Sequence, residues 1–321
     1  MYKTQPTLFM RPNRRQFLNS ALALTTTASL SSLQNASPQK VPYPVSCNQY
    51  TWITFFRREG RDWSADLDTS LAEYVQSGFK AFEPSFTKVE EVHELAPLLK
   101  KHKLALPSFY VNSTLHDAAV AQQSIESVLA IAKAAQPLGT KIVVTNPSPI
   151  RWGGPENKND AELTEQARNL DRLGAALRKM GMTLSYHTHD IELRAGAREF
   201  HHMLLNTDPA NVTFCMDVHW VYRGSGNSEL AVFDVLKLYG KRITELHIRQ
   251  SKGEIWQETF QPEGDINYPR LVQELKKMGV TPHLVIEQCL EEKTPHVLTT
   301  VEAHQKDLAA VKQTFGPLIN G

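Results

Sequence analysis

The sequence predicts an α/β fold: a single-domain closed barrel of eight parallel β-strands, each followed by a helix, which is the (β/α)8 or TIM barrel. From residue 41 onward, short apolar or β-branched runs alternate with longer segments of helical period. Eight runs of each kind can be counted, and their alternation requires parallel strands joined by crossover helices. Residues 41–321 are also close to the roughly 250 residues that such a barrel needs.

The elements follow one another in a regular order along the chain. The expected strands are Val45–Tyr50, Phe79–Phe86, Leu104–Val111, Lys141–Asn146, Thr183–His189, Val212–Val218, Ile243–Arg249 and His283–Gln288. The expected helices lie near 67–77, 87–102, 116–136, 160–180, 197–206, 228–239, 267–279 and 298–314. Asp66 before the first helix and Gly78 after it are typical helix ends, as are Gly181 and Gly279 before later strands. A doubly wound open sheet is the alternative, but no Gly-x-Gly-x-x-Gly motif follows an early strand.

Residues 1–40 differ in composition from the barrel and are interpreted as a signal peptide with a disordered tail. Arg14 and Arg15 precede Phe17 and Leu18, and an uncharged run of Ala, Leu, Thr and Ser extends over 20–33. The run is too short and too rich in hydroxyl groups for a stable membrane anchor. The paired arginines resemble the twin-arginine export motif, so we expect a periplasmic protein. The alternative is a disordered tail that contains Arg-Arg by chance.

The charge and the cysteine content exclude several functions. The 35 Lys and Arg residues nearly balance the 34 Asp and Glu residues, giving a net charge of +1, so a nucleic-acid partner is not indicated. The three cysteines, Cys47, Cys215 and Cys289, lie far apart, which favours neither a disulfide framework nor a zinc ribbon. We interpret them as small packing residues within strands.

Ionisable residues gather at the expected carboxyl ends of several strands, which is where the active sites of such barrels lie. The residues in question are Glu83, His187, His189, Asp217, His219, His247, Arg249 and Glu287. Side chains alternate along a strand, so His187 and His189 should point the same way, and so should Asp217 and His219. Burying such a group is unfavourable unless a cation or hydrogen bonds compensate, and one divalent metal ion is the simplest compensation.

Mixed nitrogen and oxygen donors suit manganese, cobalt, zinc or iron, and magnesium is a further candidate. Each histidine taken alone is more often a structural residue than a ligand, so the metal hypothesis depends on the group. Three tryptophans in expected loops, Trp152, Trp220 and Trp256, either form a stacking wall for a sugar or simply pack the loops.

Four segments together resemble the sugar phosphate isomerase/epimerase family of xylose isomerase-like barrels. They are Tyr186–Leu193, Met216–Val221 followed by Gly224, Leu246–Arg249, and Gly264–Tyr268. The resemblance implies a divalent metal held by one residue from each of strands five to eight, here His187, Asp217, His247 and Glu287. His187 stands where tagatose-type epimerases carry a glutamate, so their pair of opposed glutamates is broken. Which of His187, His189 and Glu192 contacts the metal stays open, and Arg249-Gln250 replaces the Lys-Asp that the family often shows.

The resemblance also implies an enzyme that removes a proton next to a carbonyl group of a sugar. Glu287, His189 and Glu192 are the candidate bases, and Arg249 is placed to hold an oxyanion. The candidate substrate contacts are Glu83, Trp220 and His219.

Export disfavours a phosphorylated substrate, so the favoured variant is a lyase or dehydratase acting on 3-keto-glycosides or ketosugars. The alternatives are a non-catalytic exported sugar-binding protein and a metal-dependent phosphodiesterase of the same fold. The sequence leaves the oligomeric state, including a homo-oligomer, open.

Overall fold

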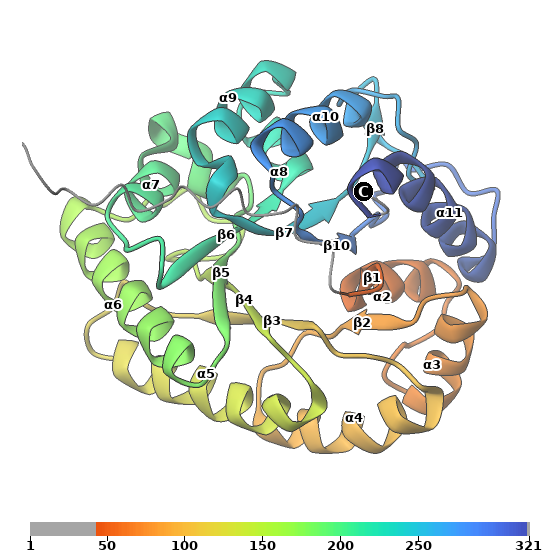
Figure 1. Ribbon diagram of the computed structural model, residues 1–321, viewed down its shortest axis with the longest axis horizontal. Helices are drawn as coiled ribbons and strands as arrows, with labels where there is room; N and C mark the ends of the chain where they lie inside the picture. Colours follow the sequence, from red (N-terminus) through yellow and green to blue (C-terminus); the bar gives the residue numbers. More distant parts are fainter. Residues whose placement is uncertain (1–42, 320–321) are drawn as a thin grey trace, which may run out of the picture. The chain divides into compact units, whose positions relative to one another are not determined.

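Eight parallel strands form a nearly closed barrel surrounded by helices in the computed structural model, which describes residues 43–319 (Figure 1). Neighbouring strands follow the order β2-β1-β10-β7-β6-β5-β4-β3. The remaining gap, between β2 and β3, is bridged at Ala81–Ala105 and at Ser85–Tyr110. The predicted fold class is therefore confirmed. The predicted signal segment lies outside the described residues.

The barrel strands are short, and nearly all of their residues are buried. They are β1 (Ser46–Asn48), β2 (Ala81–Glu83), β3 (Ser108–Ser113), β4 (Ile142–Pro147), β5 (Thr183–Tyr186), β6 (Val212–Asp217), β7 (Ile243–Ile248) and β10 (His283–Ile286). A small antiparallel pair, β8 (Ser251–Lys252) and β9 (Ile255–Trp256), follows β7. The register pairs Asp217 of β6 with His247 of β7, and His247 with Val285 of β10, so three strand ends meet at one level.

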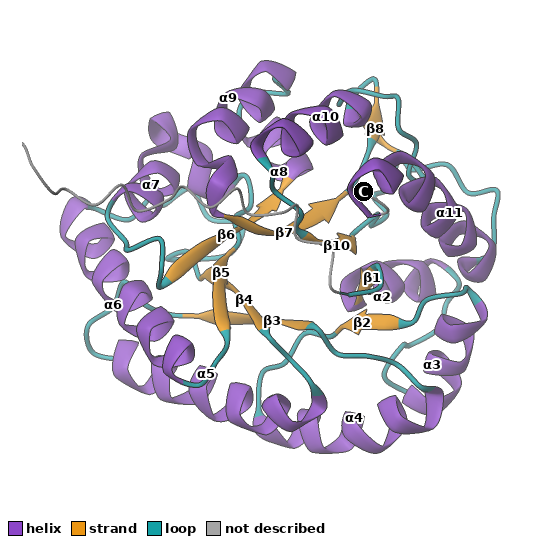
Figure 2. Cartoon of the chain, in the orientation of Figure 1, coloured by secondary structure: helices purple, strands orange, loops and turns teal. Residues whose placement is uncertain are grey.

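Helices cover the outside of the barrel (Figure 2). They are α2 (Gln49–Arg58), α3 (Leu67–Gln76), α4 (Val89–His102), α5 (Ala121–Ala135), α6 (Asp160–Lys179), α7 (Arg194–Leu205), α8 (Val218–Gly224), α9 (Glu229–Tyr239), α10 (Tyr268–Met278) and α11 (Thr300–Ile319). Local chemistry sets several ends: Asp66 caps the amino end of α3, and Gly279, with φ of 68°, ends α10. Among the described residues, we find no helix with the length and apolar character needed to cross a membrane.

Six predicted strands were extended too far at their carboxyl ends, and two of these, β1 and β6, end at a residue whose side chain caps a helix. The Asn48 side chain accepts a hydrogen bond from the backbone N–H of Tyr50 at 2.7 Å, and α2 begins at once. Asp217 accepts hydrogen bonds from the N–H groups of His219 (3.0 Å) and Trp220 (2.8 Å), which starts α8. His219 therefore lies on a helix and does not share a strand face with Asp217.

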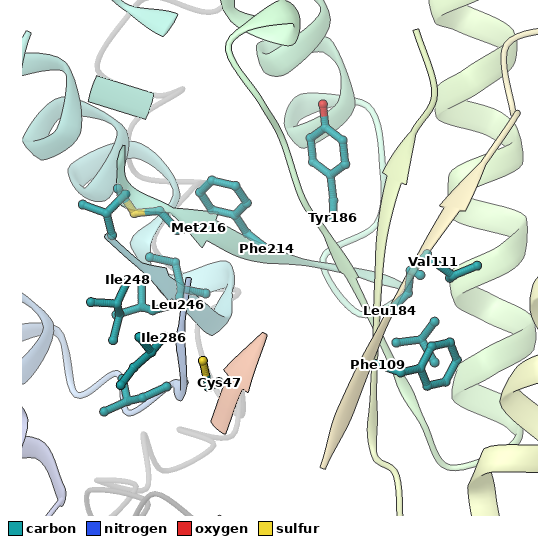
Figure 3. Packing of buried hydrophobic residues seen from close by; sticks show 14 of the residues in the cluster. Cys47, Phe109, Val111, Leu184, Tyr186, Phe214, Met216, Leu246, Ile248 and Ile286 are labelled. Atoms are coloured by element: carbon teal, nitrogen blue, oxygen red, sulfur yellow. The ribbon is translucent and has the colours of Figure 1, made fainter. Parts of the chain in front are cut away.

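Successive side chains along each strand point to opposite faces, so the buried side chains form two sets. One set of side chains packs between strands and helices, and Figure 3 shows members of this set from β3, β5, β6, β7 and β10. The other set faces the inside of the barrel, where Cys215, Glu245 and His247 approach one another. All three cysteines are buried and free, as a packing role requires.

Candidate metal centre

Four buried side chains from adjacent strand ends converge on one point. His187 follows β5, Asp217 ends β6, His247 lies in β7 and Glu287 follows β10. One donor atom from each residue lies within 4.8 Å of the donor atoms of the other three. The structure thus brings together the four residues that the resemblance implied. We call them the four-residue cluster.

The donor atoms of this cluster fit a divalent cation. His187 Nε2 lies 3.6 Å from Asp217 Oδ2, which is too long for a hydrogen bond. Neither ring nitrogen of His187 nor Oδ2 of Asp217 has a hydrogen-bond partner among the described residues. Buried polar atoms are rarely left unpaired, because losing water without a new partner is costly. Two imidazoles and two carboxylates form a donor set that suits several divalent metals.

A second layer of carboxylates lies below the cluster and orients His247. The Nε2 atom of His247 is 3.1 Å from Glu245 Oε1 and 3.3 Å from Glu83 Oε2, while Nδ1 faces Glu287 Oε2 at 2.9 Å. Asn48 donates to Glu83 at 2.6 Å. Burial and the charge of Glu83 raise the pKa of Glu245, whereas His247 lowers the pKa of Glu83 in spite of burial. An N–H group directed at this layer leaves Nδ1 as the nitrogen for a metal.

The cavity at the barrel mouth has a volume of about 680 Å³. Of the predicted site residues, it is lined by His189, Trp220, Arg249 and Glu287. Glu83 does not line it and contacts Asn48 and His247 below the cluster instead. The cavity therefore gives a ligand access to one side of the cluster, through Glu287.

His189 is the cavity residue best placed to accept a proton. Its ring lies between Trp152 and Trp220, with centroid separations of 5.2 and 5.5 Å. Its Nδ1 atom has no hydrogen-bond partner among the described residues. Burial, together with the neighbouring His187, holds the pKa of His189 well below its usual value, so the ring is neutral near pH 7.

Arg249 contacts both Glu287 of the cluster and two tryptophans that line the cavity. Its guanidinium lies 4.1 Å from the ring centroid of Trp256 and 5.3 Å from that of Trp220. Its Nε donates to the backbone oxygen of Glu287 at 2.6 Å, and Nη2 lies 3.4 Å from Glu287 Oε1. Burial alone would raise the pKa of Glu287, but the charges of Arg249 and His247 outweigh burial and hold it at about 2. Glu287 is therefore ionised.

The structure places Glu192 and His219 away from the cavity lining. Glu192 accepts a hydrogen bond from Asn146 Nδ2 at 2.9 Å and another from the backbone N–H of His189 at 2.7 Å. Burial raises the pKa of Glu192 to about 7. His219 contacts Ser251 Oγ at 2.9 Å from α8, and burial lowers its pKa to about 3. Glu192 thus fixes the backbone of His189 by a hydrogen bond. His219 packs against Trp256 and does not line the cavity.

Sequence reasoning missed Glu245, and it left the place of Trp152 and Trp256 open. Glu245 had a signal in the sequence, because it lies two residues before His247 and therefore on the same strand face. Trp152 and Trp256 both line the cavity. Their position depends on loop paths that a sequence pattern does not specify.

Comparison with known proteins agrees with this architecture. The family described as xylose isomerase-like TIM barrel matches residues 71–313. An inosose dehydratase from Clostridium botulinum (strain Alaska E43 / Type E3) is 24% identical over 200 residues, covering 59% of this chain. The match spans just under two thirds of that relative, 65% of its length.

Two solved structures share the fold. A sugar phosphate isomerase/epimerase from Parabacteroides distasonis ATCC 8503 has a TM-score of 0.63 at 18% identity, covering 91% of this chain and 100% of that one. A xylose isomerase-like TIM barrel protein from Mycobacterium smegmatis, in complex with magnesium, has a TM-score of 0.65 at 13% identity, with 87% and 98% covered. Because the family match extends over most of the described barrel, the chain belongs to the xylose isomerase-like TIM barrel family.

Proposed function

We propose that this protein is a divalent-metal-dependent enzyme that removes a proton next to a carbonyl group of a sugar. The observation that carries the proposal is the four-residue cluster, whose donor atoms lie within 4.8 Å of one another at the base of a cavity. The favoured variant is a lyase acting on 3-keto-glycosides. The similarity to an inosose dehydratase supports this variant, because a dehydratase also eliminates a group.

Each site residue has a distinct role in the proposed reaction. His187, Asp217, His247 and Glu287 would hold the cation. A bound divalent cation withdraws electron density from a carbonyl oxygen and its neighbouring hydroxyl, which makes the adjacent C–H bond more acidic. His189, which lines the cavity, accepts the proton. The guanidinium of Arg249 lines the same cavity and stabilises negative charge that develops on the substrate oxygen.

The proposed elimination balances without an oxidant or a reductant. The C–H bond at C2 of a 3-keto-glycoside breaks, and its proton passes to His189. The electron pair forms a C1=C2 double bond while the bond between C1 and the glycosidic oxygen breaks, and that oxygen takes up a proton from water to give the free aglycone. Return of a proton to C2 from the other face would give an epimer instead.

One experiment separates these outcomes. The protein is stripped of metal, reloaded with Mn²⁺, Co²⁺, Zn²⁺ or Mg²⁺, and incubated with a 3-keto-glucoside in D2O. A lyase releases aglycone, an epimerase incorporates deuterium at C2 without release, and a sugar-binding protein does neither. Loss of both activities in Glu287→Gln, with ligand binding retained, would support an enzyme, because transition-state interactions are lost selectively. Metal-loaded protein that gives neither product nor deuterium exchange contradicts the proposal.

We also propose that the protein is exported to the periplasm through its twin-arginine-type segment. The support comes from the sequence alone: Arg14 and Arg15 precede an uncharged run. Replacing both arginines with lysine should keep the protein in the cytoplasm, as measured by cell fractionation. Unchanged periplasmic accumulation of this double variant would contradict the proposal.

A further inference from the structure

We propose that a groove beside the central cavity is a subsite for a neutral sugar ring, which serves as the aglycone of the substrate. The groove has a volume of about 490 Å³ and lies over β3 and α5. It shares Phe86, Thr87 and Asn112 with the central cavity, so the two spaces adjoin at these residues. This inference rests on the proposed function, and it extends that function to glycosides larger than a single ring.

The chemistry of the groove carries the proposal. None of its lining residues, all of which the structure describes, is charged. Its polar members carry hydroxyl or amide groups: Thr87, Asn112, Thr114, Gln123, Ser124 and Ser127. Phe86 and three valines supply apolar surface between them. A lining of hydroxyls, amides and apolar surface matches a sugar ring, whose edge carries hydroxyl groups and whose faces carry C–H groups.

The same lining disfavours other ligands. A phosphate or a carboxylate would need a cation or several directed N–H donors, and the groove offers no lysine or arginine. The side chains of Gln123 and Ser127 make no hydrogen bond within residues 43–319, so their polar groups are free to bind a ligand. Asn112 is exposed at the junction of groove and cavity. The amide of Asn112 is therefore placed to contact the atoms that link two rings.

The position of the junction sets the direction of the substrate. The ring that reacts must lie toward Glu287 and His189, which line the central cavity but not the groove. The second ring then extends past Asn112 toward α5. A disaccharide that carries its ketone on the non-reducing ring satisfies both requirements.

Two adjacent glutamines on α5 provide a matched test. Gln123 and Gln122 are both exposed, but only Gln123 lines the groove. Gln123→Trp should fill the groove, whereas Gln122→Trp adds the same side chain outside it. The probes are cellobiose, maltose and the two methyl glucosides, titrated into metal-loaded protein by calorimetry. Ser127→Trp is a second blocking variant, and thermal unfolding verifies that each variant is folded.

We expect at least one disaccharide to bind wild-type protein about tenfold more tightly than its methyl glucoside, because two further hydrogen bonds contribute at this scale. Gln123→Trp should remove this advantage, and Gln122→Trp should keep it. Equal binding of disaccharides and methyl glucosides, or an advantage that survives both blocking variants, would overturn the subsite. Turnover of methyl 3-keto-glucoside in D2O tests the proposed function separately, since that substrate does not reach the groove.

Discussion

Asp217 caps a helix and, in the proposed function, also holds the metal ion, and substituting it with asparagine should remove only the second role. Its Oδ1 atom caps α8 by accepting hydrogen bonds from the backbone N–H groups of His219 and Trp220. Its Oδ2 atom has no hydrogen-bond partner among the described residues and belongs to the four-residue cluster. Asparagine caps a helix about as well as aspartate, so Asp217→Asn should keep α8 and lose a charged metal ligand.

The size of the effect follows from linkage between binding and folding. Metal at 100 times its dissociation constant should stabilise wild-type protein by about 2.7 kcal/mol. For a domain of this size, that corresponds to a Tm increase of about 5–10 °C. If losing a charged ligand weakens affinity about 100-fold, the same metal concentration stabilises Asp217→Asn by only about 0.4 kcal/mol. The Tm increase then falls to about 1 °C.

The assay is thermal unfolding of wild-type protein and of both Asp217 variants, with and without metal, followed by calorimetric titration of the metal. Asp217→Ala should lose the metal response and, in addition, about 1 kcal/mol of stability under both conditions, because the cap is gone. The reasoning is refuted if Asp217→Asn shows the same metal-induced shift as wild-type protein. It is also refuted if the two variants are equally stable without metal.

Three further predictions address the cavity. His189→Gln should lower kcat by about 100-fold or more while leaving the calorimetric metal affinity unchanged, and equal losses of both would show that His189 is a ligand. Trp152→Ala should raise KM by about tenfold, because an aromatic ring that stacks on the sugar is lost. Its Tm should change little, because Trp152 is 52% exposed. An unchanged KM would remove Trp152 from the binding site. Burial raises the pKa of Glu192 from 4.5 to about 7, so its stabilising contribution, complete below pH 4.5, should fall by about 3 kcal/mol between about pH 4.5 and pH 7. Urea unfolding at several pH values should show this decline in wild-type protein and lose it in Glu192→Gln, and an identical pH dependence in both would contradict the assignment.

Periodicity was sufficient to predict the barrel, because alternating strands and helices leave few other ways to bury both strand faces. It did not predict where six of the strands end, β1 and β6 among them. Asn48 and Asp217 lie within apolar runs that continue past the strand, and only their capping hydrogen bonds show where each helix starts. A cap is a contact between a side chain and backbone groups two or three residues away, and the pattern of hydrophobic residues does not indicate such a contact.

The proximity of His187, Asp217, His247 and Glu287 could be predicted, because parallel strands bring their carboxyl ends to the same rim. The sequence could not predict that His189 lines the cavity and Glu192 does not. These two residues lie three positions apart after β5, yet His189 lines the cavity, and Glu192, in a short 3-10 helix, accepts a hydrogen bond from the His189 backbone. Backbone conformation after β5 decides which of the two lines the cavity, and that conformation depends on tertiary contacts.

The measurement that tests the central claim most directly is anomalous diffraction from a crystal of Mn²⁺-loaded protein. We predict one strong anomalous peak within about 2.5 Å of donor atoms from His187, Asp217, His247 and Glu287, a distance typical of such ligands. Fully loaded protein with its anomalous peak elsewhere, and no density between these four side chains, would contradict the account.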